Sequence, residues 1–372
     1  MKIAIISGAI ANKPFNGGAT WTRLSWLLGF RKLGFDAYFV EQVDSDAPDL
    51  AYFREVVSTF GLDGKAALIW PNPLRVEGMD CHQLLDVAKH ADLLINISGH
   101  LTIEALKSPP AVKVYIDLDP GFTQFWHESG TSSRLDGHDY FFTVGENIGT
   151  AACSIPTGGI PWRPVRQPVV LEEWPVCPNG GTCRFTTIAS WRGPFGPVEY
   201  GGRTLGSKVR EFRKYAPLPT MSDEQFEIAL DIHPHDARDR ELLSGNSWKL
   251  ADPHIVARDP IAFRRYVQES GAEFSVAQEI YVQTGSGWFS DRSVRYLASG
   301  KPVLVEDTGF SRNYPVGDGL LTFSSLEEAA AGVHRITTNY RSHATAARQI
   351  AETYFDSGRV LGELVDQIGV CP

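Results

Sequence analysis

Cysteine and long apolar runs are scarce in this chain. Its five cysteines are odd in number and scattered over 372 residues without a Cys-x-x-Cys pair, which favours free thiols in a reducing compartment over a disulfide framework or a zinc site. The spacing of Cys177 and Cys183 would nevertheless allow a disulfide across a short loop. No run reaches the roughly 18 apolar residues of a membrane helix, and the apolar start at 2–7 is too short for a signal peptide. We therefore expect a cytoplasmic protein without a transmembrane segment.

Positive charge is also limited. The chain has 35 Lys and Arg against 44 Asp and Glu, a formal net charge of −9 at pH 7. Such a balance argues against general nucleic-acid binding, which needs a basic surface, but it is compatible with a local basic pocket for a phosphate. A length of 372 residues suits two domains better than one core.

Strand and helix patterns alternate through both halves of the chain. Continuous apolar runs typical of buried parallel strands occur in each half, and amphipathic helices separate them. We expect an α/β protein with two Rossmann-like, doubly wound domains that face each other across a cleft. The expected strands are 2–7, 35–41, 67–70, 92–98, 111–117, 140–144, 185–189, 226–232, 281–284 and 302–305.

Proline and glycine are dense between 155 and 183, which predicts an irregular connection between the domains. We expect an N-terminal domain over 1–160 and an interdomain segment over 161–183. A second domain would follow over 184–340, and a C-terminal helix over 341–372 would return to the first domain. In such folds ligands bind at the carboxyl ends of the strands.

The segment 281–305 has the pattern of a phosphate site. It reads as a strand, a loop containing Gly287, a short helix and a second buried strand. Ser290 is placed to cap the helix, with Asp291 in its first turn. A glycine loop before a helix start offers unpaired N–H groups and a partial positive charge to an anion.

The sequence LASGKPV at 297–303 resembles the end of the donor-site helix in GT-B fold glycosyltransferases of the GT4-like group (glycosyltransferase family 1 domain). The resemblance implies transfer of a hexose from a nucleotide-diphosphate sugar to a small-molecule or glycan acceptor, with retention and without a metal or another cofactor. The family pattern has two glutamates seven positions apart. Trp288 and Arg295 stand there, so neither glutamate is present, and 290–292 is similar to an Asp-Arg variant of other GT-B sequences.

Two cations are expected to bind the donor diphosphate and stabilise the leaving group. Arg192 follows the first strand of the second half and Lys208 opens the next helix, where the family carries an Arg and a Lys. Arg203 or Lys214 could take these places, and plain surface charge is the alternative. The other expected donor-binding residues are Gly17, Gly18, Leu250, Gly287, Ser290, Asp291, Arg292, Ser293 and Arg295; among these, the resemblance places Leu250 near the base and the 17–18 glycine loop near the diphosphate.

The acceptor side is expected at strand ends of the first domain. His100 follows the strand 92–98, and we predict that it lies near the transferred sugar as a catalytic residue. Asp117 and Asp119 end the strand 111–117, and only one of them can face the ligand because alternate residues point to opposite sides. Asn147 has a similar position. A capping role is the alternative for His100 and Asp119.

No metal site is predicted, since His233 and His235 lack further ligands. Two other functions remain open at this stage: an epimerase of the same fold acting on a nucleotide sugar, and a non-catalytic nucleotide-sugar-binding protein. The base, the sugar, the acceptor and the oligomeric state are not defined by the sequence.

Overall fold

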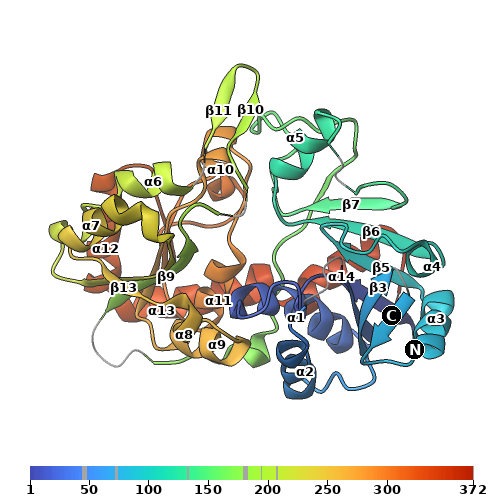
Figure 1. The fold of residues 1–372 in the computed structure, drawn as a ribbon. Helices are drawn as coiled ribbons and strands as arrows, with labels where there is room; N and C mark the ends of the chain where they lie inside the picture. Colours follow the sequence, from blue (N-terminus) through green and yellow to red (C-terminus); the bar gives the residue numbers. More distant parts are fainter. Residues whose placement is uncertain are drawn as a thin grey trace.

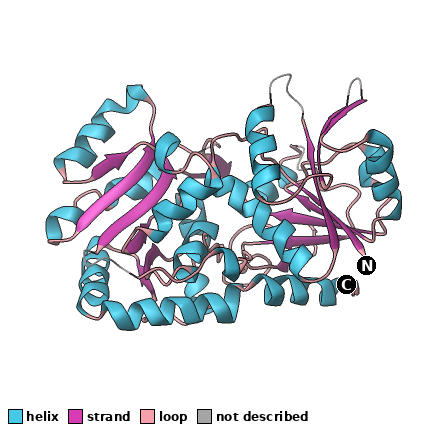
Figure 2. Ribbon diagram, turned by 90° about the horizontal axis from the view of Figure 1, so that it is seen from below, coloured by secondary structure: helices cyan, strands magenta, loops and turns pink. Residues whose placement is uncertain are grey.

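The computed structural model describes residues 1–43, 48–71, 74–131, 134–178, 183–193, 195–206 and 208–371. Two sheets, each covered by helices, form two halves that stand side by side (Figure 1). The predicted α/β layout with two Rossmann-like units is thus confirmed. The two termini lie close together on the first half (Figure 1, Figure 2).

The first half has an eight-stranded sheet in the order β4-β3-β2-β1-β5-β6-β7-β8. All neighbours are parallel except β3 and β4. Strand order reverses between β1 and β5, which places the switch point of the fold at the ends of these strands. The strands are β1 (Ile3–Ser7), β2 (Asp36–Gln42), β3 (Ala66–Pro71), β4 (Leu74–Glu77), β5 (Leu93–Ile97), β6 (Val112–Asp117), β7 (Tyr140–Thr143) and β8 (Arg163–Pro164).

Helices of the first half connect these strands. Asn16 caps α1, because its side chain accepts a hydrogen bond from the backbone N–H of Ala19. Gly34, at φ +94°, follows the helix and allows the turn into β2. The helices are α1 (Gly17–Lys32), α2 (Leu50–Thr59), α3 (Cys81–His90), α4 (Glu104–Lys107) and α5 (Phe122–Glu128).

The second half has a six-stranded, fully parallel sheet in the order β13-β12-β9-β14-β15-β16. A β10–β11 hairpin stands apart from it (Figure 1). The strands are β9 (Arg184–Ser190), β10 (Val198–Tyr200), β11 (Arg203–Leu205), β12 (Gln225–Asp231), β13 (Lys249–Ala251), β14 (Ala272–Ser275), β15 (Val303–Glu306) and β16 (Leu320–Phe323). The helices are α6 (Lys208–Lys214), α7 (Ala237–Gly245), α8 (Pro253–Val256), α9 (Pro260–Gln268), α10 (Glu279–Thr284), α11 (Asp291–Ala298), α12 (Leu326–Thr338) and α13 (Tyr340–Ile350).

The C-terminal segment crosses between the halves. After α13 and a π-helical turn (Ala351–Phe355), α14 (Ser357–Ile368) packs on α1 of the first half. The approach is close, since a Cβ at Gly29 would lie 2.5 Å from Leu361 Cδ1. The domain limits remain a prediction. Residues 179–182 of the predicted interdomain segment lie outside the described residues.

One predicted strand is wrong. Residues 281–284 form part of helix α10, and the strand of this βα unit is β14, nine residues earlier. Tyr281, Val282 and Thr284 have high strand propensity, but Gly285 adopts the left-handed conformation (φ +62°) that ends a helix. The disulfide that the spacing of Cys177 and Cys183 would allow is not formed, and all five cysteines are free.

Candidate functional site

A cleft of about 370 Å³ lies between the two halves. Its walls include the ends of β9 and β12, with Ser190 and Asp231, and the residue two positions after β6, Asp119. Parallel sheets bind their ligands at such carboxyl ends. Other lining residues are Lys13, Gly18 and Arg23 from the first half, and His254, Gln278 and Arg292 from the second.

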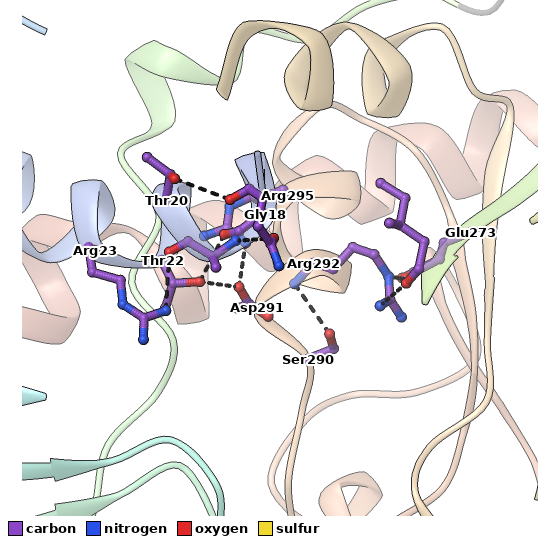
Figure 3. Close-up of polar contacts among 12 residues, drawn as sticks. Gly18, Thr20, Thr22, Arg23, Glu273, Ser290, Asp291, Arg292 and Arg295 are labelled. Atoms are coloured by element: carbon purple, nitrogen blue, oxygen red, sulfur yellow. Dashed lines mark hydrogen bonds and ion pairs between the residues drawn. The ribbon is translucent and has the colours of Figure 1, made fainter. Parts of the chain in front are cut away.

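Asp291 connects helix α11 with helix α1 across this cleft (Figure 3). One carboxylate oxygen accepts hydrogen bonds from Thr22 Oγ1 at 2.5 Å and from Arg295 Nη1 at 2.6 Å. Burial opposes its ionisation, yet the charge of Arg295 and the Thr22 hydroxyl hold the pKa of Asp291 below its usual value. Ser290 caps α11 as predicted, by accepting from the backbone N–H of Arg292 at 3.2 Å.

Arg292 lines the cleft and is hydrogen-bonded to two strands of the second half. Its guanidinium donates to Glu273 Oε1 at 2.6 Å, to Ser275 Oγ at 2.6 Å and to the Ile188 carbonyl at 2.8 Å. These bonds come from β14 and β9, so the side chain is fixed in one position. A fixed, buried cation next to a cleft is suited to an anionic ligand.

Ser293 and Arg295 point into the interior. Ser293 is fully buried and its hydroxyl lacks a hydrogen-bond partner within the described chain. Arg295 is 2% exposed and stacks over Trp174 and Phe263, with ring distances of 5.9 and 5.8 Å. Neither side chain lines the cleft, and this arrangement does not favour the predicted contacts of Ser293 and Arg295 with a donor.

The two glycines at the start of α1 serve a close contact between the halves. Gly17 donates its N–H to the Ala257 carbonyl at 2.8 Å, and a Cβ there would lie 2.1 Å from the Asp259 carbonyl oxygen. A Cβ on Gly18 would lie 2.9 Å from the ring of Phe263. Gly18 lines the cleft, whereas the N–H of Gly17 is already paired.

Arg192 and Lys208 differ in their surroundings. The side chain of Arg192 is 71% exposed and pairs with both carboxylate oxygens of Asp236, outside the cleft. Lys208 lies near Glu273, Glu306 and Arg292, and burial, followed by repulsion from Arg292, lowers the pKa of Lys208 to about 7. Lys208 therefore neighbours the cation that does line the cleft.

Two other predicted donor residues have packing roles. Gly287 has φ +74° and lies against Asn147, which a Cβ would approach to 2.7 Å. Leu250, in β13, packs on the core of the second half and does not line the cleft. The residues after it on the same connection, Pro253 and His254, do line it.

Asp117 and Asn147 are engaged in hydrogen bonds of the scaffold. Buried Asp117 accepts from the side chains of Thr123, Gln124 and Thr143 at 2.7, 2.8 and 2.7 Å. Asn147 donates to the carbonyls of Gly285 and Gly309 at 3.0 and 3.1 Å and so joins the two halves. Their predicted acceptor roles remain untested, but these groups are already paired.

Asp119 and His100 lie closer to the cleft. Asp119 lines it, and burial, with repulsion from Asp117, raises the pKa of Asp119 to about 6. His100 follows β5 and is half-buried, outside the lining residues. Burial, and then the charges of Arg23 and Lys13, lower the pKa of His100 to about 3. A neutral imidazole therefore neighbours two cations that line the cleft.

Lys13 and Arg23 are not among the site residues predicted from the sequence. Both line the cleft, and Arg23 is only 6% exposed. A signal was present: Arg23 is a charged residue between Trp21 and Leu24 on the buried face of α1. Lys13 offered no signal beyond its place in the β1–α1 loop.

Over the described ranges, no three His, Cys, Asp or Glu side chains come together as metal ligands. Instead, the imidazole Nδ1 of His233 accepts from the backbone N–H of His235 at 3.2 Å. In the same ranges, each helix is too short or too polar to cross a bilayer.

Comparison with known proteins defines the fold. No protein-family model matches the sequence, and no curated protein matches it. An alpha-glucosyltransferase in complex with UDP has 10% identity and a TM-score of 0.63, covering 99% of this chain and 100% of that one. Anabaena Alr3699/HepE in complex with UDP-glucose gives the same values, and sucrose-phosphate synthase from Thermosynechococcus elongatus has 10% identity and a TM-score of 0.57, covering 99% of both chains. The chain therefore has the GT-B fold of glycosyltransferases, as the sequence predicted.

Proposed function

We propose that this chain is a glycosyltransferase that transfers a sugar from a nucleotide-diphosphate sugar to a small-molecule or glycan acceptor. The observation that carries the proposal is the interdomain cleft, lined at the start of α11 by Arg292, in a fold whose neighbours were solved with UDP or UDP-glucose. The cleft takes groups from both halves, as a donor and an acceptor require.

Negative charge develops on the diphosphate when the bond to the sugar breaks. Arg292 is held by Glu273 and Ser275, so it needs no rearrangement to stabilise that charge. Lys208 neighbours Arg292, and an anion nearby would favour its protonated form. We assign the leaving-group role to this pair, and Arg192, engaged with Asp236, contributes less.

Donor hydroxyl recognition differs from the family pattern. Trp288 lines the cleft at the first glutamate position, and Arg295, at the second, is buried and paired with Asp291. Polar lining groups on neighbouring elements, Asp231 and Gln278, are the proposed replacements. Retention of configuration and independence from metal ions rest on the family resemblance alone, and we include them in the proposal.

The acceptor is not decided by the fold. One neighbour of 10% identity, an alpha-glucosyltransferase, was solved with UDP and a 13-mer DNA containing a HMU base. The net charge of −9 favours a small molecule or a glycan for this chain.

A non-catalytic nucleotide-sugar-binding protein is the second candidate, because the two family glutamates are absent. The experiment is a thermal-shift screen of nucleoside diphosphates and their sugars, followed by product analysis with a panel of acceptors. Transfer products with a defined anomer support the proposal. Binding without transfer or hydrolysis supports the second candidate, an altered donor sugar would indicate an epimerase, and no nucleotide binding contradicts all three.

A further inference from the structure

Arg23 is a buried cation with unused hydrogen-bonding capacity at the cleft. It is 6% exposed and lines the cavity. One guanidinium nitrogen, Nη1, donates to the Ala19 carbonyl at 3.1 Å, whereas Nε has no hydrogen-bond partner within the described chain. Leaving a buried donor unpaired is costly, so a ligand that accepts its hydrogen bond is expected.

The backbone makes room for this side chain. Gly8, directly after β1, faces the stem of Arg23, and a Cβ there would lie 2.8 Å from Arg23 Cγ. The guanidinium extends away from that of Arg292, toward the strands of the first half (Figure 3). Its position is therefore built into the first half, apart from the cation of the second half.

Lys13 adds a second positive charge to the same wall of the cleft. Lys13 and Arg23 line the same cavity, and repulsion from Arg23 is the largest cause that lowers the pKa of Lys13. Across the described ranges, neither makes an ion pair with a carboxylate. Two unpaired cations facing one cavity attract an anion.

The acidic residues around Arg23 are largely engaged elsewhere. Glu41 uses its carboxylate on three backbone N–H groups of the β1–α1 loop, at 2.7, 2.8 and 2.8 Å. Asp291 accepts from Thr22 and Arg295. Asp119 faces the same cavity, and one carboxylate does not balance two cations.

We propose that Arg23 and Lys13 bind an anionic group, a carboxylate or a phosphate, on the acceptor, so that the acceptor is a charged sugar or small molecule. The inference rests on the proposed glycosyltransferase function and adds the chemical class of its acceptor. Both cations belong to the β1–α1 region of the first half, whereas Arg292 and Lys208, assigned to the donor diphosphate, belong to the second. Arginine binds carboxylates and phosphates through paired hydrogen bonds, which suits this role.

The test begins with the protein saturated with a nucleoside diphosphate, so that the donor phosphate site is filled. Inorganic phosphate and acetate are then titrated calorimetrically into wild type, Arg23→Gln, Lys13→Gln and Arg31→Gln. The last is a matched control near the end of α1, where Arg31 donates to the Gly61 carbonyl. We expect anion binding to wild type and to the control, and a loss of about tenfold or more in the other two variants.

Additional variants and an activity measurement complete the test. If the Arg23→Gln variant folds poorly, Arg23→Lys serves in its place, because it retains the charge and should keep part of the anion affinity. Lys13→Gln should fold normally, because Lys13 is an exposed loop residue. Nucleotide release from the donor is then compared with glucose, glucose 6-phosphate and glucuronate as acceptors. Stimulation by a charged sugar, reduced in Lys13→Gln, supports the proposal and tells phosphate from carboxylate.

Several outcomes would overturn it. No anion binds to the nucleotide-saturated wild type, or neutral acceptors alone stimulate nucleotide release. Alternatively, Arg23→Gln weakens nucleoside diphosphate binding as strongly as Arg292→Gln does, which assigns Arg23 to the donor. Failure of the glycosyltransferase function itself is recognised separately, because wild type would then bind no nucleoside diphosphate, or would bind it without transfer or hydrolysis of the donor.

Discussion

The hydroxyl of Thr22 and the carboxylate of Asp291 are 2.5 Å apart, although 269 residues separate them in the chain. Thr22 lies on α1 of the first half and Asp291 begins α11 of the second. Arg295, one helical turn further, holds the same carboxylate oxygen. Asp291, one of the expected donor-binding residues, is therefore also part of a contact that joins the halves at the cleft.

Removing this contact should destabilise the protein. Thr22→Val keeps the shape of the side chain but leaves Asp291 with one partner fewer, and we expect a loss of about 1–3 kcal/mol in the free energy of unfolding at pH 7. Urea denaturation measures it. An exposed threonine exchange of the same kind, Thr345→Val on α13, is the control, and equal stability of both variants would contradict the prediction.

Asp291 should also contribute to acid sensitivity. Its folded pKa is depressed below the ordinary value of 3.8, so its stabilising contribution is present above that value and is lost as the pH falls through the folded pKa. Asp291→Asn should therefore be less stable than wild type at pH 7, and the difference should shrink below about pH 3.8. Paired urea titrations at pH 7 and at pH 3 check the sign, and a constant difference would refute it.

Substitutions of Lys208 and of Arg192 should have different effects on nucleotide affinity. Lys208→Met or Arg292→Gln should weaken nucleoside diphosphate affinity by roughly 10- to 100-fold, since each removes a charge-assisted contact. Arg192→Ala should leave the affinity nearly unchanged, because Arg192 is exposed and paired with Asp236. Calorimetric titration of each variant with a nucleoside diphosphate measures these affinities. An equal loss in Arg192→Ala would return the leaving-group role to the residue that the sequence pattern selected.

The affinity should depend on pH through the same lysine. The pKa of Lys208 is lowered to about 7, so part of the free protein holds it neutral at pH 7 and above. A bound diphosphate favours the charged form, and binding above pH 7 should take up a proton and weaken as the pH rises. Calorimetry in two buffers of different ionisation enthalpy measures that uptake. Lys208→Met should abolish it, and persistence of the uptake in this variant would exclude Lys208.

Much of the fold could be predicted because buried parallel strands leave continuous apolar runs. The runs at 2–7, 92–98 and 226–232 correspond to β1, β5 and β12. The error at Tyr281 arose where strand-forming residues were recruited into a helix: Tyr281 and Ile280 pack against Phe122 of the other half, a contact absent from local sequence.

The site was harder to predict because its cations depend on distant partners. Arg292 could be selected from the α11 motif. The position of its guanidinium, however, is set by Glu273 and Ser275, on a strand that was not predicted from the sequence. Arg192 matched the family position, and only the fold shows Asp236 beside it. Arg23 gains its place from Gly8 and from the loop that Glu41 orders. Motif reading finds residues next to a helix start, whereas it does not find those that tertiary packing brings to the cleft.

The start of α1 contacts the second half closely at Gly17. Gly17 is helical and has no positive φ, so only space restricts it, and a Cβ would come within 2.1 Å of the Asp259 carbonyl oxygen. Gly17→Ala must push α1 away from the loop before α9, and we expect a loss of about 1–3 kcal/mol in the free energy of unfolding together with weaker nucleotide binding. Gly362→Ala is the matched control: it lies in α14 with open space around it, and it should stabilise the protein by up to about 1 kcal/mol. Urea denaturation and calorimetry of both variants provide the measurement. If Gly17→Ala matched wild type in stability and affinity, the close contact at this position would not be part of the nucleotide-binding form.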